Sequence, residues 1–506
     1  MDELTELEVQ GDKLAAAIKS HAQHRRDLQL SASDISGNHP DTTKSLSKTI
    51  ADIHASMARI RTLLGGPVSF LQELARQVQT VACLKWLSEF QILACIPPDG
   101  NMTMTDLADL AGVPEPQLAR IIRLMSTSGF LNEPLPNHVS HTPISAEFIS
   151  NQPLLDATAF LTHIVAPTAL QMAPATHRFG SSQTASHTAY NLAMDTAQPF
   201  GVAIHERPKW GRQWAAYLHR AGGLRQESEI VNMLAQLKWA NIGNALIVEV
   251  NAQSTAIAQS LAKRFPTLRV VVQMDRARAS SLNLNLMEFD YPRQAPYEVN
   301  MNMRMNTRHG FAGDFDIDTY THGQLGPLNT ESTLTSTLSS VSTPAFSSQP
   351  GSSSFFVSAN ANTSGNITVT YRTNGMTQPV LGAAVYILHL ANYNPNSETT
   401  TTTSTLHAEL HNYLGVLRGS GGILLIPTEN LLPEPGSVTD PGLEAVARAR
   451  DLAMLQLGNE GEMEIMELVG VIGSIRDGAG KLVVTNQLKA GNSLVVGLMV
   501  RYEGYY

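Results

Sequence analysis

Two histidines at helical spacing are the plainest candidates for metal chemistry in this sequence. In "HAELH", His407 and His411 lie four residues apart, so a helix would place both imidazoles on one face, where they could bind zinc. The metalloprotease pattern needs a glutamate directly after the first histidine, whereas Glu409 follows two residues later. No third ligand is apparent, and the chain has only two cysteines. We therefore predict a solvated or packed histidine pair and no metal site.

A strand, turn and helix beginning near Leu246 form a second candidate site. The run "VEVNAQSTAIAQSLAKRFPTLRVVVQM" predicts a buried strand at Leu246–Val250, an amphipathic helix, and a second apolar strand at Arg269–Val272. In nucleotide-binding α/β domains, a glycine-rich turn follows such a strand and holds the phosphate or sugar of the cofactor. Here no glycine lies between Val250 and Ala258. The sequence thus predicts the strand, helix and second strand of a cofactor site but not its usual glycine-rich turn.

Length and composition indicate a multidomain α/β protein. A chain of 506 residues exceeds one ordinary core, and its 43% hydrophobic residues are normal for a globular protein. The net charge of -9 argues against avid nonspecific DNA binding. Cys83 and Cys95 lie in an apolar helical stretch, as expected of thiols in a reducing compartment. No apolar run predicts a membrane span or a signal peptide.

The pattern along the chain divides it into four parts. We expect a short helix and a flexible arm over 1–43, a helical dimerisation and winged-helix module over 44–150, a helical linker over 151–240, and an α/β domain over 241–506. A segment at about 329–366 is about half Ser and Thr, with Glu331 its only charged residue. Such a composition cannot bury enough apolar area to offset its ordering entropy. It predicts a disordered insertion or a loosely held loop.

The second part begins with two helices. Apolar residues at helical spacing, including Ile50, Met57 and Leu64, predict a helix that ends at Gly65-Gly66-Pro67. The stretch Val78–Ile96 is apolar on nearly every face, which would be an aggregation liability in a free monomer. We therefore expect a homodimer or an equivalent heteromeric cover.

A helix, a second helix and a hairpin follow, as in a winged helix. "MTMTDLADLAGV" predicts a helix capped near Thr103 or Thr105, and "PEPQLARIIRLMSTSGFL" predicts a second helix between Pro114 and Gly129. "LNEPLPNHVSHTPIS" predicts the hairpin.

The second of these helices is a poor candidate for reading DNA. A helix in the major groove needs several basic or amide side chains on its outer face. This one offers Gln117, Arg120 and Arg123, with Glu115 opposing them. A packing or dimerisation role is the better interpretation, and we predict no direct DNA reading.

The order of these parts resembles the small-molecule O-methyltransferases of plants and fungi. "AGVPEPQLARIIRLMSTSGFL" looks like their winged helix, and "FAGDF" (Phe311–Phe315) resembles the segment that lines their adenine pocket. "VYILHL", "GGILLIPTENLLPEPG" and "ARARDLAML" resemble their later strands and helices. The resemblance covers roughly residues 70–500. It implies a helical, winged-helix N-terminal half and a C-terminal Rossmann-like methyltransferase domain, with Glu249 and Asp314 at acidic or polar positions of the pocket.

The sequence departs from this resemblance at the cofactor loop. In the enzymes, glycines let the methionine part of S-adenosylmethionine lie against bare backbone. Here the corresponding residues all carry side chains: Asn251, Ala252, Gln253 and Thr255. The carboxylate that holds the ribose hydroxyls is replaced by Met274, with Asp275 one residue late. We therefore predict no cofactor and no cofactor-binding residues.

The catalytic base is missing as well. The resemblance places a histidine in a "His-Asp-Trp" type segment after the fourth strand, where it deprotonates the substrate hydroxyl. The corresponding run is "LHLANYNPNS", in which Asn392 or Tyr393 takes the position of the histidine, and His389 lies too early. Neither replacement is a base near neutral pH. We predict no catalytic residues and no methyl transfer.

A closer resemblance is to the methyltransferase-like coactivators of fungal aromatic polyketide clusters, whose type member is the aflatoxin and sterigmatocystin pathway regulator. "YNLAMDTAQPFG", "ERPKWGRQWAAYLHRAGG" and the glycine-free "VEVNAQST" are similar to these proteins. This resemblance implies a nuclear coactivator that assists a zinc-cluster transcription factor.

Two alternatives stay open. One is a divergent O-methyltransferase or a cofactor-free cyclase acting on an aromatic polyketide. The other is a structural partner that dimerises with an active methyltransferase.

Overall fold

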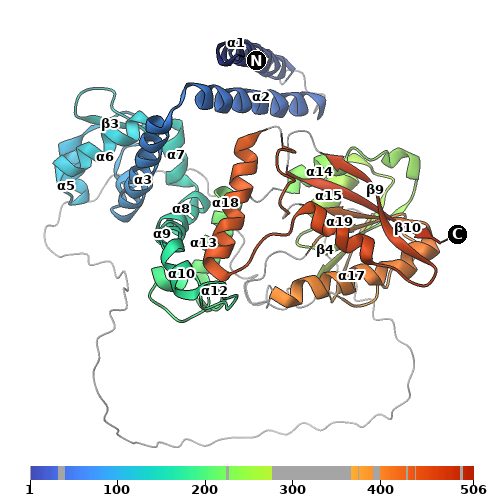
Figure 1. Cartoon of the computed structure of the whole chain (residues 1–506). Helices are drawn as coiled ribbons and strands as arrows, with labels where there is room; N and C mark the ends of the chain where they lie inside the picture. Colours follow the sequence, from blue (N-terminus) through green and yellow to red (C-terminus); the bar gives the residue numbers. More distant parts are fainter. Residues whose placement is uncertain are drawn as a thin grey trace, which may run out of the picture. The chain divides into compact units, whose positions relative to one another are not determined.

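The computed structural model describes most of the chain outside one long central segment (Figure 1). The described residues are 2–31, 40–223, 227–275, 366–373, 375–390, 399–428, 431–438, 440–489 and 494–505. They belong to one compact unit. Three predicted features lie outside the described residues. They are the adenine-pocket segment Phe311–Phe315, residues 329–365 of the Ser/Thr-rich segment, and the positions of the catalytic base, Asn392 and Tyr393.

Residues 3–31 and 40–64 form two long helices that pack together, where a short helix and a flexible arm were predicted over residues 1–43. α1 (Glu3–Ser31) is a 29-residue helix, and it packs along α2 (Pro40–Leu64). Arg59 of α2 donates two hydrogen bonds to Glu6 of α1, at 2.6 and 2.8 Å. The prediction was wrong because the polar composition of α1 conceals good helix formers, which a second helix then stabilises.

The next segment contains the predicted pair of helices and the hairpin. After α3 (Pro67–Glu89) and the short α4 (Ile92–Cys95), α5 (Met104–Ala111) begins at Thr103, whose hydroxyl caps the helix by accepting the Asp106 N–H. α6 (Glu115–Thr127) follows Pro114. β2 (Leu131–Asn132) and β3 (His138–His141) then pair antiparallel, and β1 (Met102–Thr103) joins the far side of β3. We call α5, α6 and these strands the N-terminal module.

A helical region follows, as predicted. Its elements are α7 (Pro143–Ser150), α8 (Gln152–Phe160), the π-helix η1 (Leu161–Val165), α9 (Ala166–Leu170), α10 (Met172–Phe179), α11 (Ala189–Ala193), α12 (Phe200–Glu206), α13 (Pro208–Arg220), α14 (Glu227–Leu234) and the short η2 (Trp239–Ile242). The run Gln152–Leu170 is long and apolar enough to cross a membrane by length and composition. Its Phe160 packs in a buried aromatic cluster with Trp214 and Tyr217 of α13. Within this run, 44% of the apolar window is buried inside the structure.

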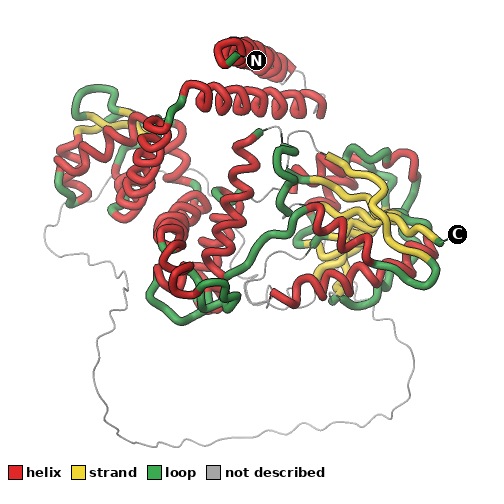
Figure 2. The backbone as a smooth tube through the Cα atoms, in the orientation of Figure 1, coloured by secondary structure: helices red, strands yellow, loops and turns green. Residues whose placement is uncertain are grey.

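The C-terminal part contains a sheet, whose strands are yellow in Figure 2. The sheet has seven strands in the order β6-β5-β4-β7-β8-β10-β9. The strands are β4 (Leu246–Ala252), β5 (Arg269–Asp275), β6 (Ile367–Arg372), β7 (Val385–Leu388), β8 (Ile423–Pro427), β9 (Gly480–Lys489) and β10 (Val496–Gly504). The first five are parallel, and β10 runs antiparallel between β8 and β9. The strands predicted near Leu246 and Arg269 are confirmed, and the order is that of a doubly wound domain.

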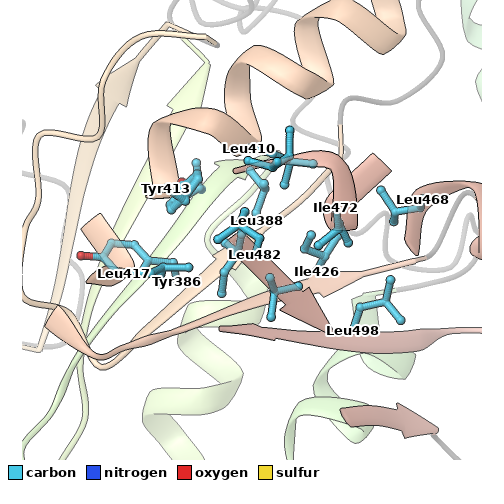
Figure 3. Packing of buried hydrophobic residues seen from close by; sticks show 14 of the residues in the cluster. Tyr386, Leu388, Leu410, Tyr413, Leu417, Ile426, Leu468, Ile472, Leu482 and Leu498 are labelled. Atoms are coloured by element: carbon cyan, nitrogen blue, oxygen red, sulfur yellow. The ribbon is translucent and has the colours of Figure 1, made fainter. Parts of the chain in front are cut away.

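Helices cover both faces of this sheet. α17 (Thr399–Ser420) and α19 (Ile465–Ser474) pack on one face, where Tyr386, Leu388, Leu410 and Ile472 meet in a buried cluster (Figure 3). α14 and α15 (Ala256–Arg264) pack on the other face. α18 (Pro441–Gly458) instead packs in the aromatic cluster of the helical region. Because helices cover both faces, the central strands β4, β7 and β8 are mostly apolar, which is why the sequence identified them.

Candidate functional site

The reversal of strand order between β4 and β7 marks the candidate site. From β4 the chain winds through β5 to β6 on one side, and β7 and β8 lie on the other side. In open α/β sheets, ligands bind outside the carboxyl ends of the strands at this switch point. β4 and β7 bring three polar residues there, Glu249, Asn251 and His389.

A buried carboxylate and a histidine face each other at the switch point. Glu249 of β4 is 1% exposed, and its Oε1 lies 3.1 Å from Nε2 of His389, which directly follows β7. Its second oxygen, Oε2, is buried and has no hydrogen-bond donor among the residues the structure describes. From the resemblance, Glu249 was expected only at an acidic or polar position of the pocket, and His389 was judged too early for a catalytic base. The structure joins the two as one pair.

Asn251 forms the turn that glycine forms in the enzymes. Its φ is 58°, in the left-handed region, which asparagine tolerates better than most residues with a side chain. Its Nδ2 donates to the His389 carbonyl oxygen at 3.2 Å, and the His389 N–H donates to the Val250 carbonyl at 3.1 Å. The turn thus keeps a left-handed residue without glycine, and the side chain links the ends of β4 and β7.

The other three substituted loop residues lie in different surroundings. Ala252 is buried in the core beside β5, and Gln253 is exposed. Thr255 lies at the start of α15, where its Oγ1 accepts a hydrogen bond from Gln259. Among the four, Asn251 is the residue that links β4 to the residue following β7.

Met274 and Asp275 are the last two residues of β5, at the strand end where the resemblance places the carboxylate that holds the ribose hydroxyls. Met274 lies near the carboxyl end of β5 and packs against the buried cluster that contains Val270 and Val272. Asp275 ends the strand, opposite Arg372 of β6 in the register. A thioether cannot accept the strong hydrogen bonds that a carboxylate accepts from two hydroxyls.

A buried ion pair between β6 and α17 was not predicted from the sequence. Arg372 donates two hydrogen bonds to Glu409, at 2.7 and 3.1 Å, and both side chains are about 5% exposed. Glu409 also accepts the Gly375 N–H at 2.7 Å. The Glu409 carboxylate therefore binds both the end of β6 and the residues that follow it.

Next to this pair, two glutamines and a tyrosine form a second buried polar group. Gln273 and Gln378 exchange two amide hydrogen bonds of 2.8 and 2.9 Å, and Gln378 also donates to the Tyr413 hydroxyl at 3.3 Å. Burial and the nearby Glu409 carboxylate raise the pKa of Tyr413 above its usual range. A tyrosine held in its protonated form cannot act as a general base.

The histidine pair on α17 faces solvent. His407 and His411 are exposed, whereas Glu409 between them turns inward to Arg372. No group of three or more metal-ligating side chains lies close together in the described ranges. The preference for a solvated pair agrees with this placement.

The outer face of α6 carries less free positive charge than its sequence suggests. Arg123 donates to Asn137 at 2.7 Å and to Glu133 at 3.4 Å, both in the hairpin loop between β2 and β3. Gln117 and Arg120 are exposed. One of the two arginines that could contact DNA is therefore bound to the hairpin of its own module.

Two comparisons with known proteins identify relatives over the full length, although no family model matches the sequence. The chain is 51% identical over 506 residues to the notoamide biosynthesis cluster transcriptional coactivator notR of Aspergillus sp. (strain MF297-2), which covers 100% of this chain and 99% of that protein. It is 36% identical over 509 residues to the monodictyphenone cluster transcriptional coactivator mdpA of Emericella nidulans, with 100% and 99% covered.

A solved structure shares the fold over nearly the whole chain. The structure of LepI in complex with SAM matches with a TM-score of 0.56 and covers 97% of this chain and 100% of that one. At 13% identity this likeness shows the fold alone, and it confirms the expected methyltransferase-like α/β architecture. The two full-length relatives define the family more narrowly. The chain belongs to the family of fungal gene-cluster transcriptional coactivators.

Proposed function

We propose that this protein activates transcription of a fungal aromatic polyketide gene cluster through protein contacts and without methyl transfer. The observation that carries the proposal is full-length identity of 51% to a named coactivator. The named relatives serve different clusters, so the shared property is coactivation rather than one pathway product.

The switch point supports the absence of methyl transfer. Asn251 takes the left-handed position of the loop and its amide donates to the His389 carbonyl, so the loop carries a side chain where the resemblance places bare glycine backbone. Met274 replaces the ribose carboxylate. We infer that the fold now serves as a scaffold for contacts with other proteins.

We propose that DNA contact is delegated to a zinc-cluster transcription factor. The chain has two cysteines, too few for a zinc cluster of its own, and its net charge is -9. Arg123 of α6 is bound to Glu133 and Asn137. The protein would then act in the nucleus, where that regulator binds promoters, and "HRRD" at residues 24–27 is too short to serve as a nuclear signal on its own.

We further propose that the protein is a homodimer through its N-terminal half. Large apolar side chains in this part are exposed in the single chain, among them Phe70 at 66% and Leu71 at 65%. Exposed apolar groups gathered in one region are typical of protein interfaces.

One observation favours the enzyme alternative. Glu249 and His389 form a buried acid–base pair at the place where α/β enzymes bind ligands, and one carboxylate oxygen has no donor in the described part of the chain. A divergent O-methyltransferase or a cofactor-free cyclase could use such a pair. The amide of Asn251 and the apolar Met274 make the coactivator the better proposal.

A reporter assay with a matched pull-down tests the proposal. The tagged full-length chain is expressed in a strain that carries the pathway regulator, and a promoter of the cluster drives the reporter. We expect the zinc-cluster regulator in the pull-down, and we expect H389Q to activate the reporter as well as the unmodified chain at equal protein level. Loss of activation by H389Q, with the regulator still bound, would favour chemistry at the switch point. Recovery of an active methyltransferase without the regulator would favour the structural-partner alternative.

A further inference from the structure

The outer face of helix α18 is apolar although it is exposed. Met454 and Leu457 are buried in the aromatic cluster of the helical region, which fixes the inner side of the helix. Leu452 and Leu455 lie on the outer side and are 42% and 45% exposed. A helix on the surface of a globular protein normally carries polar side chains there. The outer side of α18 therefore has the composition of a contact surface.

The junction of α9 and α10 extends this surface. α9 packs against α18 (Figure 1), and Gln456 of α18 donates a hydrogen bond to the Met172 sulfur at 3.5 Å. Gln456 lies one helical turn after Leu452, so the start of α10 lies close to the exposed leucines. Leu170, at the end of α9, is 77% exposed, and Met172 is 42% exposed. These four apolar side chains are called the α18 face below: Leu170, Met172, Leu452 and Leu455.

The chain around the end of α18 is strongly acidic. Residues 451–475 contain five acidic side chains and no Lys or Arg. Two of the five are bound to arginines of α18 itself, Glu462 to Arg450 and Glu464 to Arg448. Both arginines are therefore already paired, and the segment keeps an excess of negative charge.

Glu460 is one of the acids without a cation. It follows Asn459, whose amide donates to the carbonyl oxygens of Thr184 and His187 at 2.8 and 3.1 Å and so holds the end of α18 in place. Glu460 is half-buried, and burial alone raises its pKa to about 7. No ion pair or hydrogen bond of its carboxylate is found in the described part of the chain. Ionised Glu460 therefore lowers the stability of the chain on its own.

Asp451 places a second carboxylate beside the α18 face. It lies one helical turn before Leu455, and its Oδ1 accepts the Glu462 N–H at 2.7 Å. The described residues provide no ion pair for Asp451 either. A group that destabilises the free protein is typical of a functional surface, where a partner offsets the loss. The α18 face thus combines exposed leucines with two carboxylates that lack a cation.

This charge selects the kind of partner. Nucleic acid and anionic lipid carry phosphates, which Asp451 and Glu460 repel. A second copy meeting the same face would bring the same carboxylates into the interface, where like charges weaken binding. A polypeptide segment with apolar side chains and Lys or Arg suits both features, because an amphipathic helix can lay its apolar side on leucines while a cation reaches a carboxylate.

We propose that the α18 face docks a basic amphipathic segment of the transcription regulator. This rests on the coactivator function proposed above and names its contact surface.

Binding of the purified full-length regulator to the purified full-length chain tests the proposal. At pH 8, E460Q should raise the dissociation constant at least about 10-fold, because a cation of the regulator loses its carboxylate. The same variant should melt at a higher temperature than the unmodified chain, because burial does not penalise a neutral amide as it does a carboxylate. Removing a carboxylate with a purely structural role would not raise stability and lower affinity together.

The leucines are tested in the same assay. L452S/L455S removes two apolar side chains from the α18 face and should also weaken binding at least about 10-fold. Two matched controls should bind as the unmodified chain does. E503Q removes an exposed carboxylate elsewhere, and L110S/L135S removes two leucines that are exposed in the N-terminal module.

The outcomes separate the docking surface from the coactivator function. If E460Q and the unmodified chain bind the regulator equally well, the docking surface is wrong and the coactivator proposal stands. E460Q decides this even where L452S/L455S fails to fold. A regulator that does not bind the unmodified chain would refute the coactivator proposal and the docking surface with it. If L452S/L455S changes the sedimentation of the isolated chain and not its affinity for the regulator, a second copy covers the α18 face and the proposal is overturned.

Discussion

At the residue scale, Asn251 explains how β4 can turn toward α15 without glycine. Asparagine accepts the left-handed φ of 58°, and its amide donates to the His389 carbonyl. The sequence correctly indicated that this loop had changed, but it could not show that one residue of the four takes over the turn. That distinction depends on the direction of each side chain.

Substitutions of Asn251 should separate its two roles. N251G keeps the left-handed backbone and loses the hydrogen bond, at a cost of about 0.5–1.5 kcal/mol. N251A loses the hydrogen bond and also makes the left-handed backbone unfavourable, so it should destabilise the fold by about 1–2 kcal/mol more than N251G. Urea unfolding of the purified variants measures the difference. Equal stability of N251A and N251G would show that the backbone conformation at this position is not constrained.

Breaking the buried Arg372–Glu409 pair should strongly destabilise the C-terminal fold. E409A leaves the Arg372 guanidinium buried without its partner, which costs about 3–5 kcal/mol. H407A, on the exposed side of the same helix, should change stability by less than about 0.5 kcal/mol. Denaturant midpoints of both variants test this. A similar midpoint for E409A and H407A would contradict the account of the pair.

Glu460 should make stability depend on pH. It is half-buried, and desolvation raises its pKa from 4.5 to about 7. The folded chain therefore holds this proton more tightly than the unfolded chain, and stability is lost as the pH rises from about 4.5 to about 7. E460Q mimics the protonated form, so its melting temperature should exceed that of the unmodified chain increasingly as the pH rises from 5 to 8. The same change at exposed Glu503 serves as the control. A difference in melting temperature between E460Q and the unmodified chain that stays constant with pH would exclude Glu460 as the source of the pH dependence.

At the scale of elements, periodicity predicted those whose side chains reflect local burial. β4 and β5 are apolar because both sheet faces are covered, and α5 begins at the predicted cap Thr103. The Gln273–Gln378 amide pair joins residues 105 positions apart, which no local pattern reveals. The exposed apolar face of α3 could not be predicted from the sequence either. An apolar residue that a partner covers cannot be told in the sequence from one that is buried in the core.

The α6 helix gives an element-scale prediction about DNA. Because Arg123 is bound to Glu133 and Asn137, the unmodified chain should bind a labelled promoter duplex no more tightly than about 10⁻⁶ M at physiological salt, as nonspecific binders do. R120A should leave reporter activation unchanged. Fluorescence anisotropy measures the affinity for the duplex, and the reporter assay measures activation by R120A. Nanomolar binding that R120A abolishes would make α6 a DNA-reading helix.

At the scale of the whole molecule, the chain keeps a methyltransferase-like fold from end to end while its relatives are named coactivators. The fold was accessible from the sequence because the order of helices and strands survives. The departures that the sequence predicts from the enzymes, Asn251 and Met274, lie near the carboxyl ends of β4 and β5. The remaining surface is free to specialise in protein contacts.

Calorimetric titration of S-adenosylmethionine into the purified full-length protein tests the central claim most directly. Losing several charge-assisted hydrogen bonds, at about 1.5–3 kcal/mol each, should weaken binding by several orders of magnitude. We therefore expect no measurable heat of binding at cofactor concentrations up to the physiological range. A variant with glycine at 251, 252, 253 and 255 serves as the comparison. Micromolar binding by the unmodified protein, or methylation of a phenolic pathway intermediate above background, would contradict the account.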